Sequence, residues 1–319
     1  MIIKREVRID GYVLGLDGGG SKTTVQIADT DGKVLIQNKS GSCNYKSVGI
    51  EIAKNNINTV ILNSLEEVGI PDIIFKSACF GLAGNDTDED MKIYNRIIFN
   101  NKLKKFLNSS TTIICNDSKI GLIAGSNKKN RLMVISGTGA NCFGINEDGR
   151  EAKANGWDYI LGDEGSGYTI GLKALKAIVR AYDGRGRHTL LTDIVLDYLK
   201  LKDISELVSW VYDKPFFKEK IAELSEIVCS AAKMGDILSI EILREEAGEA
   251  ASTVMVVVNK LNLADKDFDL VLVGGVFKCE KYFKNLFFKI LKNKFQGINF
   301  KSLTEKPVEG AIKLALESL

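Results

Sequence analysis

The chain has 319 residues, of which 45% are hydrophobic and 26% are charged. A chain of this size and composition can bury one large core or two, which is typical of a globular protein. Its 43 basic residues nearly balance its 41 acidic ones, so charge alone does not point to nucleic acid, and small ligands are favoured. The N-terminus, MIIKREVRID, lacks the apolar core of a signal peptide, and no apolar run is long enough to span a membrane. We therefore expect a cytoplasmic protein.

Cysteine and histidine give little sign of metal or nucleophilic chemistry. The six cysteines are widely spaced without a Cys-x-x-Cys pair, and several lie in apolar runs such as SACFGLA. We expect them to be reduced, buried thiols rather than a metal site or a disulfide framework. The single histidine, His188, follows the polar run YDGRGR and is expected to be a solvated loop residue. General-base chemistry must then come from a carboxylate.

The first third of the chain is predicted to form an α/β unit. Its expected elements are, in chain order, strands near 12–17, 22–29 and 33–38, a helix over about 48–68, a strand in FKSACFGLAG, a helix over about 88–107 and a strand in TTIICND. Asp31-Gly32 is a hairpin signal between the second and third strands, and Gly69 is a stop signal for the first helix.

The chain then repeats this order. The segment RLMVISGTGANCFGINEDGREA again has a strand, a Gly-rich turn, a strand, an Asp-Gly hairpin and a strand, which a duplicated α/β unit explains. The pattern from about 165 to 261 is almost entirely helical, FDLVLVGGVF is a late buried strand, and Pro307 opens the last helix. We expect two lobes, 1–116 and 117–319, with a cleft between them, and the last helix is a candidate for return to the first lobe.

A first glycine cluster lies between the first two strands. The motif LDGGGSKT differs by one residue from the spacing of a P-loop, and a β-branched strand follows it instead of a helix. Glycines at a tight strand-to-strand turn let backbone N–H groups approach an anion closely, while a hydroxyl and a lysine follow. The candidate phosphate-binding residues here are Gly18, Gly19, Gly20, Ser21 and Lys22. Asp17, at the end of the first strand, is a candidate to hold Mg²⁺ through water.

Two later glycine clusters extend this pattern. SGTGAN repeats the hairpin device with Gly137, Thr138 and Gly139, and two such hairpins indicate a nucleotide's phosphates. In VGGVF, Gly274 and Gly275 follow a buried strand. They would let a flat ring pack on the backbone, as an adenosine pocket requires, although a close helix–strand contact explains them equally well.

Two further acidic segments are candidates for catalysis or for contact with a polar ligand. Asp117 ends the strand TTIICN and begins a helix, where it is either a helix N-cap or a catalytic carboxylate at the carboxyl end of a strand. The segment NGWDYILGDEGSGYTIG has five glycines and Trp157 ahead of a helix whose first turn Asp163 and Glu164 would favour. The tryptophan and the glycines indicate a loop folded closely around a polar ligand.

Taken together, LDGGGSKT, CNDS, ISGTGANC, GWDYILGDEGSGY and LVGGVF resemble the ordered motifs of N-acetylglucosamine kinases and their bacterial relatives in the benzoyl-CoA-reductase-type ATPase family. The resemblance extends from Leu14 to Gly310. It implies a two-lobed, actin-like (ribonuclease H-like) α/β fold with duplicated units, and by family analogy a homodimer.

The resemblance also implies an activity: ATP-dependent phosphorylation of the 6-hydroxyl of an amino sugar. N-acetylglucosamine is favoured, while N-acetylmuramic acid, glucosamine and glucose stay open. Asp117 would be the general base, and Mg²⁺ would be positioned by Asp17. The sugar-binding residues it implies are Asn44, Asp117, Ala140, Asn141, Gly156, Trp157, Asp158, Tyr159 and Asp163.

Two alternatives come from the same superfamily. Some relatives are ATPases that activate 2-hydroxyacyl-CoA dehydratases or benzoyl-CoA reductases through a shared iron–sulfur cluster, and they carry a Gly-Gln-Asp signature where this chain has GDEGSG. A non-catalytic, sugar-responsive binding protein is the second alternative. Repressors of that kind carry a helix-turn-helix ahead of the first phosphate strand, and we expect none here because only a short segment precedes Tyr12.

Overall fold

The computed structural model describes residues 11–70, 72–212 and 218–319, and they form two compact units. The first unit contains the described chain up to Asn127 together with Leu303–Leu319, and the second contains Lys128–Ser302. The sequence places the boundary before Asp117, whereas the structure places it after helix α4 (Asp117–Gly125). The reason is close packing of α4 on helix α12 (Pro307–Glu317), where a Cβ on Gly310 would lie 1.9 Å from the carbonyl oxygen of Ile120.

The first unit is built on a five-stranded mixed sheet of order β3-β2-β1-β4-β5. Its elements before α4 are β1 (Tyr12–Gly18), β2 (Lys22–Asp29), β3 (Val34–Gly41), α1 (Tyr45–Val48), α2 (Ile50–Val68), β4 (Ser77–Leu82), α3 (Asp88–Ile98) and β5 (Thr112–Asn116). These elements confirm the expected order. The expected helix over 88–107 is too long, because the side chain of Asn100 donates to the carbonyl oxygen of Ile97 at 2.6 Å and accepts from the N–H of Lys102 at 2.8 Å, which ends the helix.

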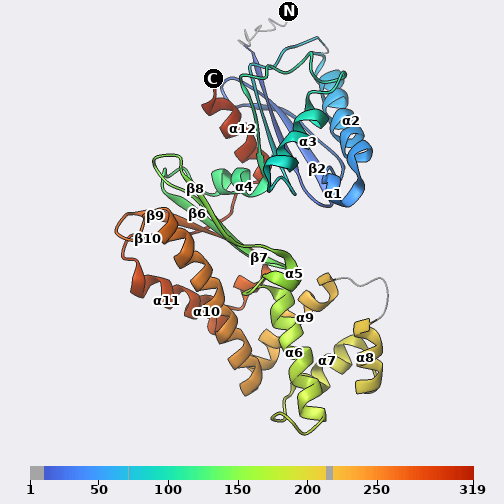
Figure 1. Cartoon of the computed structure of the whole chain (residues 1–319), viewed down its shortest axis with the longest axis vertical. Coiled ribbons are helices and arrows are strands. Elements are labelled where there is room, and N and C mark those ends of the chain that lie inside the picture. The colour runs from blue at the N-terminus through green and yellow to red at the C-terminus, as the bar shows by residue number, and fades with distance from the viewer. Residues whose placement is uncertain (1–10, 71, 213–217) are drawn as a thin grey trace, which may run out of the picture. The chain divides into compact units, whose positions relative to one another are not determined.

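The two faces of this sheet are covered by different helices. Side chains alternate along β1, so Leu14 and Leu16 pack into the core under α2 and α3, whereas Val13 packs into the core under α4 and α12. Figure 1 shows α2 and α3 on one side of the sheet and α12 on the other. The carboxyl ends of β1, β4 and β5 are parallel neighbours, which brings Asp17 and Asp117 to one edge of the sheet.

The second unit repeats the topology of the first. Its strands are β6 (Arg131–Ser136), β7 (Ala140–Ile145), β8 (Glu151–Asn155), β9 (Phe268–Val273) and β10 (Ile298–Ser302), in the order β10-β9-β6-β7-β8. In each unit three antiparallel strands come first. A fourth strand then pairs in parallel with the first strand, and a fifth pairs in parallel with the fourth. The predicted duplication is confirmed.

Helices fill the long segment between β8 and β9. They are α5 (Asp158–Leu161), α6 (Gly167–Tyr182), α7 (Leu191–Leu199), α8 (Ile204–Tyr212), α9 (Lys218–Lys233) and α10 (Ile237–Lys260). This confirms the expected helical segment, except that its residues 213–217 lie outside the described ones. After β9 come the short helices η1 (Gly275–Lys278) and η2 (Glu280–Lys284) and then α11 (Asn285–Lys294). None of the helices in the described ranges is both long and apolar enough to cross a membrane.

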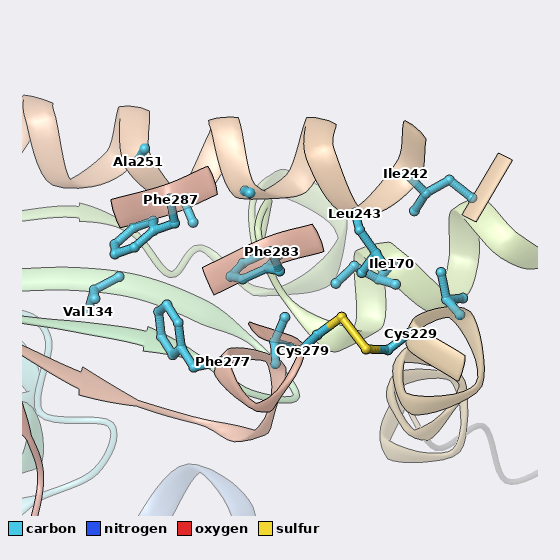
Figure 2. Close-up of a cluster of buried hydrophobic side chains, with 14 of the residues drawn as sticks. Val134, Ile170, Cys229, Ile242, Leu243, Ala251, Phe277, Cys279, Phe283 and Phe287 are labelled. Carbon is cyan, nitrogen blue, oxygen red and sulfur yellow. A yellow bond between two sulfur atoms is a disulfide. The ribbon is translucent and has the colours of Figure 1, made fainter. Parts of the chain in front are cut away.

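The cysteine prediction is wrong for one pair. Cys229 in α9 and Cys279 after η1 form a disulfide, which Figure 2 shows close to Leu243 of α10. The fold brings together two cysteines that are 50 residues apart in sequence, so no local spacing could reveal the pair. The other four cysteines are free and buried, as expected.

Candidate functional site

The tip of the β1–β2 hairpin is exposed at Gly20. The N–H of Gly19 donates to the carbonyl oxygen of Lys22 at 2.9 Å, and the hydroxyl of Ser42 donates to the carbonyl oxygen of Gly19 at 3.2 Å. A Cβ on Gly18 would lie 2.3 Å from Sγ of Cys43, so packing requires glycine there, whereas one on Gly20 would meet nothing within 4 Å. Packing therefore does not explain why residue 20 is glycine. Close approach of a ligand to its backbone would explain it.

Asp117 is the first residue of α4, and its carboxylate is not the cap of that helix. Asn116 is the N-cap, since its side chain accepts from the N–H of Ser118 at 2.8 Å. Burial, and then the nearby charge of Asp17, raise the pKa of Asp117 from its ordinary value of 3.8 to about 6. Burial also raises the pKa of Asp17, an effect that Lys22 opposes. A carboxyl group whose pKa lies near the working pH suits a general base.

Asn44 already has a structural role. Its side-chain oxygen caps α1 by accepting from the N–H of Lys46 at 3.1 Å, and the same oxygen lies against Gly84, where a Cβ would approach it to 2.8 Å. The cap explains the residue type without a ligand. Its contact with sugar stays a prediction.

In the second unit, the β6–β7 hairpin lies directly against the third glycine cluster. Gly274 has a φ of +113°, and a Cβ there would lie 2.2 Å from the carbonyl oxygen of Ser136, at the base of the hairpin. The same Cβ would lie 2.7 Å from the backbone nitrogen of Gly137. The structure thus brings the second phosphate-binding candidate and the adenosine-binding candidate together.

The segment after β8 concentrates unusual backbone conformations. Of the five non-glycine residues with positive φ in the described ranges, three lie here: Asn155, Asp158 and Asp163. Gly156 and Gly165 share this conformation, with φ of +76° and +87°. Such residues persist only where the surroundings fix them, and they cluster at functional sites.

Asp163 is the central polar side chain of this segment. It is 3% exposed, and its Oδ1 accepts from the N–H of Ala140, in the β6–β7 hairpin, at 2.9 Å. Its Oδ2 is buried without a hydrogen-bond partner in the described chain, as is Oδ1 of Asn141. Burial raises the pKa of Asp163, and the Ala140 N–H opposes that shift. A buried polar atom without a hydrogen-bond partner destabilises the folded state. A polar ligand that supplies the missing partners would explain why these residues are present.

The remaining sugar candidates surround this carboxylate less closely. A Cβ on Gly156 would lie 2.8 Å from Cβ of Asn141, so these two residues touch. Tyr159 packs edge-on against Tyr168 with ring centroids 5.3 Å apart. Trp157 is 70% exposed and lies under Nζ of Lys153, 5.9 Å from the ring centroid. The indole contributes nothing to the core, which leaves its face available to a ligand.

Lys218 belongs to the site but has no sequence signal. At the start of α9, its Nζ pairs with Asp158 and lies 3.9 Å from Oδ2 of Asp163. The hydrogen bond from Lys218 holds the pKa of Asp158 below its ordinary value. Some 55 residues of helical pattern separate this lysine from the loop, so only the fold could reveal the contact.

The second unit contains a pocket of about 290 Å³ beside the disulfide. It is lined by Ser225, Glu226, Cys229, Ser230, Lys233, Leu243, Gly275, Val276, Lys278 and Cys279. The predicted adenosine-binding Gly275 is therefore in a pocket wall, and no Cβ contact within 4 Å would oppose a larger residue there. No group of three or more His, Cys, Asp or Glu side chains suited to a metal ion occurs in the described part of either unit.

Comparison with known proteins identifies the family. An N-acetylmuramic acid/N-acetylglucosamine kinase of Clostridium acetobutylicum is 37% identical over 304 residues, which cover 95% of this chain and 98% of that protein. An N-acetyl-D-glucosamine kinase of Dictyostelium discoideum is 32% identical over 96% of this chain and 98% of its own length. A solved structure from Chromobacterium violaceum, whose name provisionally assigns it to the N-acetylglucosamine kinases, matches with a TM-score of 0.69 at 22% identity over 96% of this chain and 99% of that one, which confirms the predicted fold. The model of the BadF/BadG/BcrA/BcrD ATPase family matches residues 14–316, so the chain belongs to that family.

Proposed function

We propose that this protein is a kinase that transfers the γ-phosphate of ATP to the 6-hydroxyl of an amino sugar, with N-acetylglucosamine as the favoured acceptor. The observation that carries the proposal is the geometry of Asp163. One of its oxygens accepts a hydrogen bond from the phosphate hairpin at Ala140. The other is buried without a hydrogen-bond partner, with Nζ of Lys218 3.9 Å away, as a carboxylate that accepts from a sugar hydroxyl would be. The two relatives named for kinase activity on N-acetylated amino sugars support the same substrate class.

In the proposed reaction Asp117 takes the proton of the sugar hydroxyl. The oxygen forms a bond to the γ-phosphorus while the bond from that phosphorus to the β,γ-bridging oxygen breaks, and ADP leaves. With a pKa of about 6, the carboxylate of Asp117 is ionised at neutral pH and is a stronger base than an ordinary aspartate. Backbone N–H groups of the two glycine hairpins would hold the phosphates, with Ser21 and Thr138 adding hydroxyl donors.

Asp17 is the residue we propose to hold Mg²⁺ through water. The fit rests on charge, because Asp17 and Asp117 are close enough for one to raise the pKa of the other. A bound divalent cation would offset part of this negative charge and part of the charge of the triphosphate.

The pocket beside the disulfide is the proposed adenosine site. Gly275 and Val276 form one wall, Leu243 contributes an apolar side chain, and Lys278 contributes a cation. A volume of about 290 Å³ is near the lower limit of small-ligand pockets, which suits a base better than a whole nucleotide.

Reduction of the Cys229–Cys279 disulfide is expected to weaken both the fold and ATP binding. The bond closes a loop of 50 residues, and loss of such a cross-link costs about 2–4 kcal/mol. Because both cysteines line the pocket, the KM for ATP should rise as well. Thermal unfolding and ATP titrations with and without a dithiol reductant measure the two effects. A Cys229→Ser/Cys279→Ser double variant is the control, since reductant should not change it, and six reactive thiols in unreduced, denatured protein would refute the bond.

Replacement of Asp163 by Asn is expected to raise the sugar KM by about 10- to 100-fold, because a hydrogen bond to a charged group contributes about 1.5–3 kcal/mol. The KM for ATP should change much less. Glu164→Gln is the matched control, since it removes the same charge at a neighbouring position whose side chain is exposed. Equal effects of the two substitutions on the sugar KM would mean that Asp163 does not contact sugar.

An ADP-release assay tests the proposed activity. Purified protein with ATP and Mg²⁺ is offered N-acetylglucosamine, N-acetylmuramic acid, glucosamine and glucose in turn. We expect ADP release above background, greatest with an N-acetylated sugar, and a 6-phosphate product by NMR. Absence of sugar-dependent ADP release with all four would contradict the proposal. Light scattering of the same sample tests the homodimer that the family resemblance implies.

The iron–sulfur alternative fits this chain poorly. All six cysteines lie in the described ranges, and each is either buried as a free thiol or joined in the disulfide. A cluster shared between two subunits needs cysteines at the surface where the subunits meet. Cys115, the most exposed of the four free thiols, is only 8% exposed.

A further inference from the structure

Glu246 is a fully buried carboxylate that neither the motifs nor the proposed chemistry uses. It lies in the middle of α10, between Leu243 and Ala247 on the apolar face of that helix, and is 0% exposed. Burial raises its pKa, an effect that Lys173 and the N–H of Gly165 oppose. A buried charge needs good partners to be retained, so its contacts indicate what it does.

Those contacts lead to the loop that carries Asp163. Oε2 of Glu246 accepts from the N–H of Gly165 at 2.6 Å, and Oε1 pairs with Nζ of Lys173 at 2.5 Å. Gly165 has a φ of +87°, and a Cβ there would lie 2.9 Å from Cβ of Ala250, so its peptide lies directly on α10. Charge-assisted hydrogen bonds of this kind are stronger than those between neutral groups.

The same glycine is also held by the phosphate hairpin. The hydroxyl of Ser136 donates to the carbonyl oxygen of Gly165, and two residues later the N–H of Gly167 donates to the carbonyl oxygen of Gly137 at 2.7 Å. The peptide of Gly165 is thus fixed between α10 and the β6–β7 hairpin. Asp163 lies two residues earlier and has a positive φ.

We propose that Glu246 is a positioning residue for sugar binding: it holds Gly165 against α10 and thereby sets the place of the Asp163 carboxylate relative to the phosphate hairpin. This inference rests on the proposed function, since it assigns a role to Asp163 in sugar binding. The negative charge strengthens the bond to Gly165, and Lys173 compensates that charge.

The chain offers a matched control one residue away. Glu245 pairs with the same lysine, with its carboxylate 2.9 Å from Nζ, but its side chain is 62% exposed. Glu246→Ala should raise the KM for N-acetylglucosamine by about 10-fold or more, because it removes a charge-assisted hydrogen bond. Glu246→Gln keeps an acceptor for Gly165 and should restore most of the affinity. Glu245→Ala should leave the sugar KM unchanged.

Sugar and ATP titrations of the four proteins, with unfolding midpoints measured alongside, decide the matter. A role in stability alone would lower the unfolding midpoint and the folded fraction, and hence the apparent kcat, without a change in sugar KM. If Glu246→Ala does not fold, Glu246→Asp replaces it, because its carboxylate keeps the charge but is one methylene short of Gly165, and the sugar KM should then rise several-fold. An unchanged sugar KM in every folded Glu246 variant overturns the inference while leaving the kinase proposal intact. A wild-type protein that phosphorylates no sugar overturns both.

Discussion

Asp117→Asn is expected to abolish nearly all sugar phosphorylation while the protein stays folded. A general base contributes about 10²- to 10⁴-fold to a rate, and an amide in the same place cannot accept the hydroxyl proton. Because Asn116 caps α4, the substitution leaves the helix start intact. We expect kcat to fall by that factor with little change in either KM, measured by product formation at saturating ATP. Near-wild-type turnover would contradict the assignment of Asp117 as the base.

The raised pKa of Asp117 also predicts how activity and stability should depend on pH. In the wild type, activity should rise with pH through about 6, since only the ionised carboxylate accepts a proton. Below about pH 4 the carboxyl group is protonated in both the folded and the unfolded protein, so its burial carries no ionisation penalty. As the pH rises through about 6 the folded state loses stability relative to the unfolded state, because its carboxyl group has the higher pKa. The Asn variant should therefore be more stable than wild type at pH 8, by on the order of 2 kcal/mol, and the difference should vanish near pH 4.

Asp86→Asn is the control for these measurements. The charge of Asp86 also raises the pKa of Asp117, but its side chain is exposed. Its removal should keep activity and move the acidic limb of the pH profile to lower pH. A loss of activity as large as that of Asp117→Asn would mean that general negative charge, rather than one base, matters.

The motifs and the order of elements were predictable because they depend on local pattern. Gly69 does end α2 in a left-handed conformation, and the two Asp-Gly hairpins mark the duplicated units. Asp163 and Gly274 were found as parts of short motifs. The pattern did not show which glycines are needed for packing. A side chain on Gly18 would clash with Cys43, whereas one on Gly20 would meet no neighbouring atom within 4 Å.

The residues that sequence reasoning missed act over long separations. Lys218 and the Cys229–Cys279 pair meet their partners only after the helices between β8 and β9 have packed. Glu246 did leave a signal, because it occupies an apolar position in the helical sequence ILREEAGEAAS, with buried Ile242, Leu243 and Ala250 at helical intervals. An acid on the apolar face of a helix is a reason to look for a buried partner.

Gly274→Ala is expected to damage both the stability of the second unit and the use of ATP. Its φ of +113° disfavours any residue with a Cβ, and the added methyl group would lie 2.2 Å from the carbonyl oxygen of Ser136, a backbone atom that cannot rotate away. We expect a loss of about 3 kcal/mol or more, seen as a fall in the unfolding midpoint of roughly 5–10 °C.

The neighbouring glycine separates backbone strain from a general intolerance of larger residues. Gly275→Ala places its methyl group where no atom lies within 4 Å, so its unfolding midpoint should equal that of the wild type. If the protein with Gly274→Ala folds at low temperature, the displaced Ser136 should disturb the hairpin that follows it, and the KM for ATP should rise more than the KM for sugar. Equal unfolding midpoints for the two variants would mean that the backbone of Gly274 does not lie against the carbonyl group of Ser136. The contact of Gly274 with Ser136 and Gly137 is what places the adenosine-binding candidate beside the phosphate-binding hairpin.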